Sequence, residues 1–275
     1  MFIATLSFSL LSILVKYLSH IPAHELVFFR AVISLVITST QIRYLGISPW
    51  QEEQKMLVLR GVFGTIALIT FFISIQKIPL GTSAILAYST PIFTTIIGIF
   101  YLKEKVNKMQ WLAFFISFLG VFIVKGFDKN LPILYFLLGV VSALSSAIVY
   151  NLIRKIRKAV HPLVIVFYFP LVALPFMGIW TFFDGIMPQG WDWFWIVCIG
   201  LLTQLGQICM TMSLQSTSVA KSTTVQFLGV INGLLFSIFF FKEKYDIWAI
   251  GGILLIGIGV ISGLYAAKKD EHATT

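Results

Sequence analysis

Seven polar side chains lie within or beside long apolar stretches, where each could contact a small solute. An arginine can attract an anionic group, and an amide, a phenol or a hydroxyl can hold a solute through hydrogen bonds. These residue types predict binding without bond breaking, so no catalytic residue is assigned. The predicted substrate-binding residues are Arg30, Tyr88, Tyr150, Gln204, Gln207, Thr211 and Gln226.

Arg30 is the clearest charged residue inside an apolar stretch, about six residues or 9 Å beyond the start of the stretch at residue 24. An ionisable group is costly to bury in a membrane, so such a residue is a functional hypothesis by default. Two interpretations stay open. The guanidinium group either bonds to helix-end carbonyls or snorkels to the interface, or it attracts an anionic group of the solute.

Gln204, Gln207 and Thr211 are spaced at i, i+3 and i+7, which predicts that they share one face of a helix. An amide that faces lipid leaves its donors unpaired, so this face should meet protein or a cavity. A hydrogen bond between helices explains the pattern as well as a solute contact does.

The acidic residues and histidines argue against an ion-driven carrier and against an enzyme. All eleven acids and all four histidines fall in loops or at the ends of apolar stretches. A carrier driven by protons or Na⁺ usually places a carboxylate near the midplane, so exchange or facilitated movement is favoured. Cys198 and Cys209 are eleven residues apart, about 16 Å along a helix, so they cannot bridge each other. No metal and no cofactor are expected.

The composition predicts a membrane protein. Of the 275 residues, 58% are hydrophobic and only 11% are charged, whereas a soluble domain carries about 25% charged residues. The net charge of +9 comes from basic clusters at the ends of apolar stretches, which orient a membrane protein, so no nucleic-acid partner is expected. The fold class is an all-α polytopic membrane protein with ten transmembrane helices. The predicted segments are residues 2–19, 24–45, 57–76, 80–102, 108–125, 131–153, 162–183, 191–214, 219–241 and 247–266.

The ten segments form two copies, because the sequence matches itself at an offset of 139 residues. Gly61 then meets Gly200, and a Lys-Glu-Lys triplet centred on Glu104 meets another centred on Glu243. The triplets are interpreted as locks on helix ends. Five spans per copy is an odd number, so the second copy enters the membrane inverted, as in carriers with alternating access. The predicted domains are 1–127 and 128–267, with a short cytoplasmic tail at 268–275.

The charges of the loops favour both termini in the cytoplasm. In that orientation thirteen Lys and Arg residues lie inside and six outside, with Arg60 counted among the inside residues. The predicted location is the bacterial inner membrane. Gly259 and Gly263 form a small-xxx-small pair, read as packing within the fold with a homodimer contact as the alternative.

Residues 21–30 (IPAHELVFFR), Pro91 with residues 101–104 (YLKE), and residues 241–243 (FKE) resemble the EamA branch of the drug/metabolite transporter superfamily. The resemblance covers nearly the whole chain. It implies two inverted five-helix repeats around a central cavity lined mostly by helices 1, 3, 4, 6, 8 and 9. Pro91 corresponds to Val230 in the second copy, which would let the two halves bend differently.

The leading functional hypothesis is a transporter of a small polar or zwitterionic metabolite, amino-acid-like or nucleoside-like, that works by alternating access. Its partners would be the solute and the lipid bilayer. A lipid-handling flippase, a class within the same superfamily, is the alternative. A membrane-embedded enzyme would need a paired acid, a metal set or a nucleophile with a base inside the spans, and the segments offer none of these.

Overall fold

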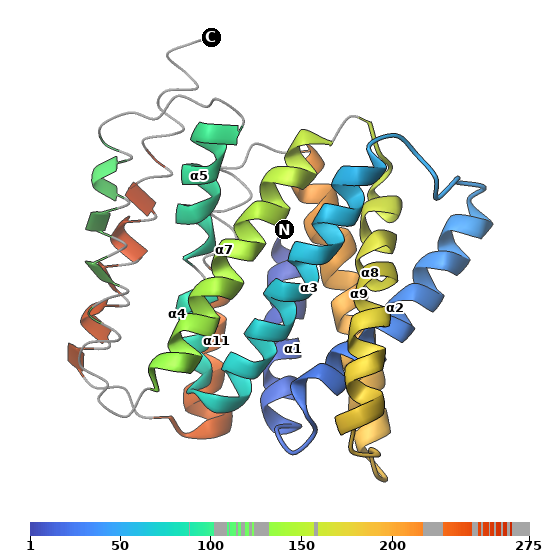
Figure 1. The fold of residues 1–275 in the computed structure, drawn as a ribbon. Helices are drawn as coiled ribbons and strands as arrows, with labels where there is room; N and C mark the ends of the chain where they lie inside the picture. Colours follow the sequence, from blue (N-terminus) through green and yellow to red (C-terminus); the bar gives the residue numbers. More distant parts are fainter. Residues whose placement is uncertain are drawn as a thin grey trace.

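The computed structural model describes residues 1–87, 89–101, 132–156, 159–216 and 228–243, with single residues and short runs within 109–123 and 247–265. In these parts of the chain every regular element is an α-helix (Figure 1). The helices are α1 (Phe2–Tyr17), α2 (Ala23–Tyr44), α3 (Gln54–Lys77), α4 (Leu80–Ala87), α5 (Thr90–Tyr101), α7 (Ile133–Lys155), α8 (Pro162–Asp184), α9 (Asp192–Ser216) and α11 (Leu228–Phe241).

Five of these helices, α2, α3, α7, α8 and α9, are long and apolar enough to cross a membrane. Large apolar side chains such as Val36, Phe182 and Phe239 are exposed on the outside of the bundle, as a lipid-facing surface requires. The prediction of an all-helical membrane fold is therefore confirmed for the described residues. The count of ten helices stays a prediction, because the segments 108–125 and 247–266 lie largely outside those residues.

The predicted segment 80–102 is two helices, because α4 ends at Ala87 and α5 begins at Thr90. Pro91 is the second residue of α5, where its missing N–H costs no helical hydrogen bond. Interrupted helices of this kind frame the solute sites of many carriers.

Contacts between loops define two ends of the bundle. The backbone N–H of His161, just before α8, donates to the side-chain oxygen of Gln51, just before α3, at 2.8 Å. The helices α1, α3 and α8 therefore begin at one end, which we call the amino-terminal end. At the other, the far end, the Glu25 carboxylate at the start of α2 accepts from the N–H of Ile186, just after α8, at 2.7 Å.

One hydrogen bond occurs twice, at the offset of the sequence repeat. The Gln76 amide donates to the carbonyl oxygen of Ile21 at 2.9 Å. The Gln215 amide donates to the carbonyl oxygen of Val160, also at 2.9 Å. Donor and acceptor are each displaced by 139 residues, and the first bond is at the far end whereas the second is at the amino-terminal end.

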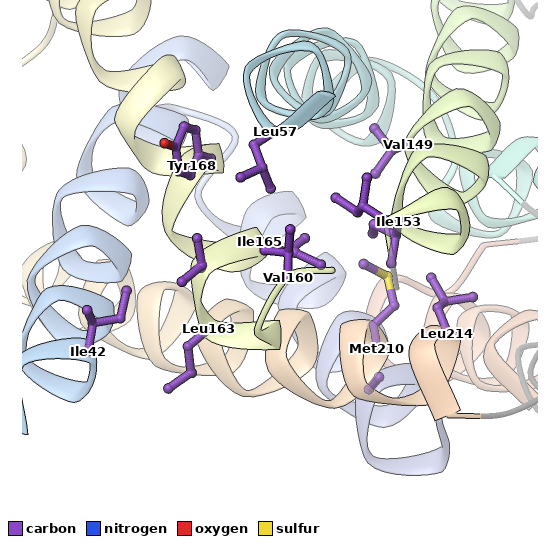
Figure 2. Close-up of a cluster of buried hydrophobic side chains, with 13 residues drawn as sticks. Ile42, Leu57, Val149, Ile153, Val160, Leu163, Ile165, Tyr168, Met210 and Leu214 are labelled. Carbon is purple, nitrogen blue, oxygen red and sulfur yellow. The ribbon is translucent and has the colours of Figure 1, made fainter. Parts of the chain in front are cut away.

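Buried apolar clusters hold the bundle together at both ends. Figure 2 shows the cluster at the amino-terminal end, where Leu57 of α3, Ile153 of α7, Ile165 of α8 and Met210 of α9 converge. A second cluster at the far end includes Val15 of α1, Leu18 just after α1, and Ile75 of α3. The polar residues between these clusters therefore lie on helices whose two ends are packed against their neighbours.

Two glycines allow close helix contacts, again at repeat positions. A Cβ atom at Gly61 of α3 would lie 2.7 Å from Val172 of α8, and one at Gly200 of α9 would lie 2.7 Å from Ile33 of α2. Val172 and Ile33 are themselves 139 residues apart. The contacts of α3 with α8 and of α9 with α2 are therefore equivalent.

We expect Gly61→Ala to lower the free energy of unfolding by about 1–3 kcal/mol, because overpacking forces neighbouring atoms apart. The added methyl would lie 2.9 Å from the backbone oxygen of Tyr168, which cannot move as a side chain can. Thermal unfolding of the purified protein measures the effect. Gly251→Ala is the matched control, because no described residue lies within 4 Å of its added methyl. Equal melting temperatures for the two variants would contradict the prediction.

Candidate functional site

A cavity of about 190 Å³ lies among the helices of both halves. A volume of roughly 10–15 Å³ admits one water molecule, so this cavity has room for a small organic solute. Most of the described lining comes from α1, α3, α4, α7, α9 and α11, with Thr90 added by α5. Counting α4 with α5 as the fourth helix, this is the set of helices that the resemblance implied.

Two buried arginines give the cavity its charge. Arg30 of α2 and Arg60 of α3 both line it, and each side chain is only 1% exposed. No Asp, Glu or Lys is among the described lining residues. Coulomb interactions are strong in a poorly hydrated interior, so the lining favours negative charge.

Phe169 of α8 is the aromatic partner of both arginines. The central carbon of Arg30 lies 5.0 Å from the centroid of the Phe169 ring, and that of Arg60 lies 5.5 Å from the same centroid. Arg30 also approaches the ring of Phe72 at 5.9 Å. Guanidinium groups bind aromatic faces through cation–π attraction, which fixes their planes and leaves their edges available.

The guanidinium edges are only partly used within the described structure. One Arg60 nitrogen, Nη2, donates to the side-chain oxygen of Gln207 at 3.0 Å. Nε and Nη2 of Arg30, and Nε and Nη1 of Arg60, have no hydrogen-bond partner there. Buried donors are nearly always satisfied in folded proteins, so the four unpaired nitrogens single out the two arginines as candidates for a contact with a solute.

Three of the predicted residues, Arg30, Tyr150 and Gln207, meet at this cavity. Tyr150 contributes from α7 and Gln207 from α9, so the side chains come from three helices far apart in the sequence. The interpretation of Arg30 as a partner of helix-end carbonyls receives no support from its two open nitrogens. Tyr88 and Gln226 lie outside the described residues.

Gln204 and Thr211 are not among the described lining residues of this cavity. The Gln204 amide accepts from the Ser34 hydroxyl and donates to the Thr38 hydroxyl at 2.8 Å. This network joins α9 to α2, which is the interhelical alternative for that residue. Thr211 is fully buried, and its hydroxyl has no partner in the described part of the chain.

Arg60 was missed from the sequence, because it was counted among the cytoplasmic loop charges. The expected segment begins at residue 57, whereas α3 begins at Gln54. Arg60 is thus six residues inside its helix, about 9 Å, a depth similar to that which singled out Arg30. Testing each arginine for depth with earlier helix starts would have found it.

One acidic side chain joins the two halves at the far end of the bundle. The Glu243 carboxylate, just after α11, accepts from the backbone N–H groups of Leu80 and Gly81 at 2.7 and 3.3 Å. These are the first residues of α4, so the carboxylate caps the positive end of that helix. The Lys16 ammonium donates to the carbonyl oxygen of Ile78 at 2.6 Å, next to this cap.

The sequence matches a family model and several curated proteins along nearly its whole length. The model described as the EamA-like transporter family matches residues 1–126 and 133–263. The chain is 30% identical to the pseudopaline exporter CntI of Pseudomonas aeruginosa, over 97% of this chain and 95% of the exporter. It is 27% identical to solute carrier family 35 member G1 of Mus musculus, over 90% of this chain and 73% of that carrier.

Two further comparisons agree with these. The chain is 22% identical to the S-adenosylmethionine uptake transporter of Rickettsia felis, over 92% of this chain and 87% of that transporter. A solved crystal structure superposes with a TM-score of 0.72, covering 97% of this chain and 94% of that chain at 14% sequence identity. At that identity the superposition shows the fold alone.

Proposed function

The chain belongs to the EamA-like transporter family, and from that premise we propose that it carries a small polar or zwitterionic metabolite, amino-acid-like or nucleoside-like, by alternating access. It is a multi-pass membrane protein and a small-molecule transporter, not an enzyme, as the named functions of its relatives indicate.

The single observation that carries the proposal is the cavity between the two halves. Its lining combines Arg30 and Arg60 with Tyr150, Gln207 and an apolar surface. Ligand sites are typically apolar hollows with a few converging polar groups. A zwitterionic or polar metabolite needs this combination of a charged anchor and apolar walls.

Alternating access rests on two inverted five-helix repeats, proposed at 1–127 and 128–267 with a tail at 268–275. The paired hydrogen bonds of Gln76 and Gln215 support an inversion, because equivalent bonds lie at opposite ends of the bundle. Arg30 and Phe169 are also repeat partners, and they touch. Equivalent residues can touch only near the axis that relates two repeats, so this contact marks the centre of the proposed carrier.

Exchange or facilitated movement is the proposed mode, in a bacterial inner membrane with both termini in the cytoplasm. The lining holds no carboxylate among its described residues, and a carboxylate is the usual carrier of a coupling proton. One relative is named as an exporter and another as an uptake transporter. The direction of transport therefore has to be measured.

Purified protein in liposomes tests the function directly. A thermal-shift screen of amino acids, nucleosides and related metabolites selects the solute, because a bound ligand raises apparent stability. The labelled solute should then enter loaded liposomes in a saturable way and exchange with unlabelled solute. Movement of labelled lipids without movement of any solute would favour the flippase alternative and overturn the proposal.

Gln207 and Gln204 provide a matched pair on one helix, three residues apart. We expect Gln207→Ala to raise the KM for uptake about tenfold, because it removes a polar group from the cavity and the hydrogen-bond partner of Arg60 Nη2. Gln204→Ala should lower the melting temperature and leave the KM unchanged, since it breaks the network with Ser34 and Thr38. The same KM change in both variants would contradict this division of roles.

A further inference from the structure

We propose that Arg30 and Arg60 together form a carboxylate-binding site, so that the transported solute presents a carboxylate group to the centre of the cavity. This inference rests on the proposed function and narrows its substrate class. It states which group of the solute is bound and by which two side chains.

The two buried arginines lack a negatively charged partner in the described lining. Arg30 and Arg60 are both 1% exposed, and they rank as the two largest fully buried side chains. Breaking a buried ion pair is strongly destabilising because a buried charge then remains uncompensated. The described lining contains no acidic side chain that could compensate either arginine. A carboxylate on the solute would supply this missing negative charge.

Both arginines can reach one solute. Their central carbons lie 5.0 and 5.5 Å from the centroid of the same Phe169 ring, so they cannot be further apart than the sum of those distances. A small metabolite spans this separation. Two nitrogens on each arginine have no hydrogen-bond partner among the described residues, so each guanidinium group has donors left for the solute.

The protein holds both arginines in place before the solute arrives. Phe169 faces both guanidinium groups, and Gln207 accepts one hydrogen bond from Arg60. Arg30 is further held against the ring of Phe72. Preorganised donors lose little entropy on binding, which is why fixed guanidinium forks are effective carboxylate receptors.

A carboxylate fits these donors better than a phosphate does. Phosphate sites usually add backbone N–H groups at a helix start to their cationic side chains. Leu80 at the start of α4 lines the cavity, but the N–H groups of Leu80 and Gly81 already bond to Glu243. The planar fork of a guanidinium group matches a carboxylate and a phosphate alike, so it is the occupied N–H groups that favour the carboxylate.

Three five-carbon probes of different charge test the proposal on the purified protein: glutarate, its neutral diamide glutaramide, and the dication cadaverine. In a buffer free of other carboxylates, we expect saturating glutarate to raise the melting temperature by about 2–4 °C. Glutaramide and cadaverine should have no such effect. Equal shifts with all three probes, or a shift with inorganic phosphate or chloride equal to that with glutarate, would overturn the proposal.

Variants assign the effect to the two arginines. Arg30→Gln and Arg60→Gln should each weaken glutarate binding about tenfold or more, because each removes charge-assisted hydrogen bonds. Arg43→Gln removes the same charge from the exposed end of α2 and should bind glutarate normally. If a glutamine variant does not fold, Arg30→Lys and Arg60→Lys keep the charge and should still weaken binding. Unchanged glutarate binding in folded Arg30 and Arg60 variants would refute the site.

Transport assays separate this inference from the function that it narrows. Saturable uptake of a cationic or neutral metabolite, together with no response to glutarate, would refute the carboxylate site and leave the carrier function standing. Liposomes that move none of the screened metabolites would refute the carrier function, whatever the result with glutarate. The two failures therefore give different results.

Discussion

Uptake should fall about a hundredfold when Arg30 is replaced by lysine, although the positive charge remains. The lysine ammonium is a point charge that lacks the planar fork of the guanidinium group. It cannot stack in the same way on Phe169, where the arginine carbon lies 5.0 Å from the ring centroid. Losing one or two charge-assisted hydrogen bonds to the solute weakens binding by about ten- to a hundredfold. Initial uptake rates per folded molecule in liposomes measure the effect.

Two comparisons make the Arg30 result specific. Arg43→Lys makes the same exchange at the exposed end of α2 and should transport normally. A lower melting temperature with normal uptake per folded molecule would instead assign Arg30 a structural role. Unchanged uptake together with unchanged stability would show that neither role is real.

The all-helical fold and the position of Arg30 within an apolar stretch could be predicted from the sequence, because both depend on local patterns. Apolar runs of membrane-spanning length identify helices without reference to their neighbours. Comparing the two copies singled out Arg30 against Phe169 as the largest difference in charge. In the structure these two side chains contact each other at the cavity.

The roles of individual polar residues could not be predicted, because they depend on neighbours from other helices. Gln204 and Gln207 lie on similar faces of α9, and only the packing of α2 decides that Gln204 bonds to Ser34 and Thr38. Arg60 was missed for a different reason. Helix starts read from hydropathy are uncertain by a few residues, and three residues decided whether Arg60 counted as a loop charge.

Glu243→Gln should open the far end of the bundle about ten times more often. A glutamine has one acceptor oxygen and no charge, whereas the Glu243 carboxylate holds two N–H groups of α4 at 2.7 and 3.3 Å. The loss also removes a negative charge from the positive end of that helix. Because α11 and α4 belong to different halves, weakening this contact favours their separation.

Labelling of a single cysteine measures the opening. Ser12 lines the cavity and is close in size to cysteine, so Ser12→Cys is a suitable reporter once Cys198 and Cys209 are replaced by alanine. A membrane-impermeant maleimide applied from the far side should label the reporter about ten times faster in the Glu243→Gln background. Equal labelling rates in both backgrounds would show that Glu243 does not hold this end closed.

The repeat partner Glu104 turns this experiment into a test of the whole mechanism. Glu104 lies outside the described residues, but its position in the sequence repeat predicts an equivalent contact at the amino-terminal end. If alternating access uses both contacts in turn, Glu104→Gln should increase labelling of the same reporter from the amino-terminal side, the opposite of the Glu243→Gln effect. An effect of both variants on the same side would contradict the inverted repeat, because an inverted repeat places equivalent residues at opposite ends.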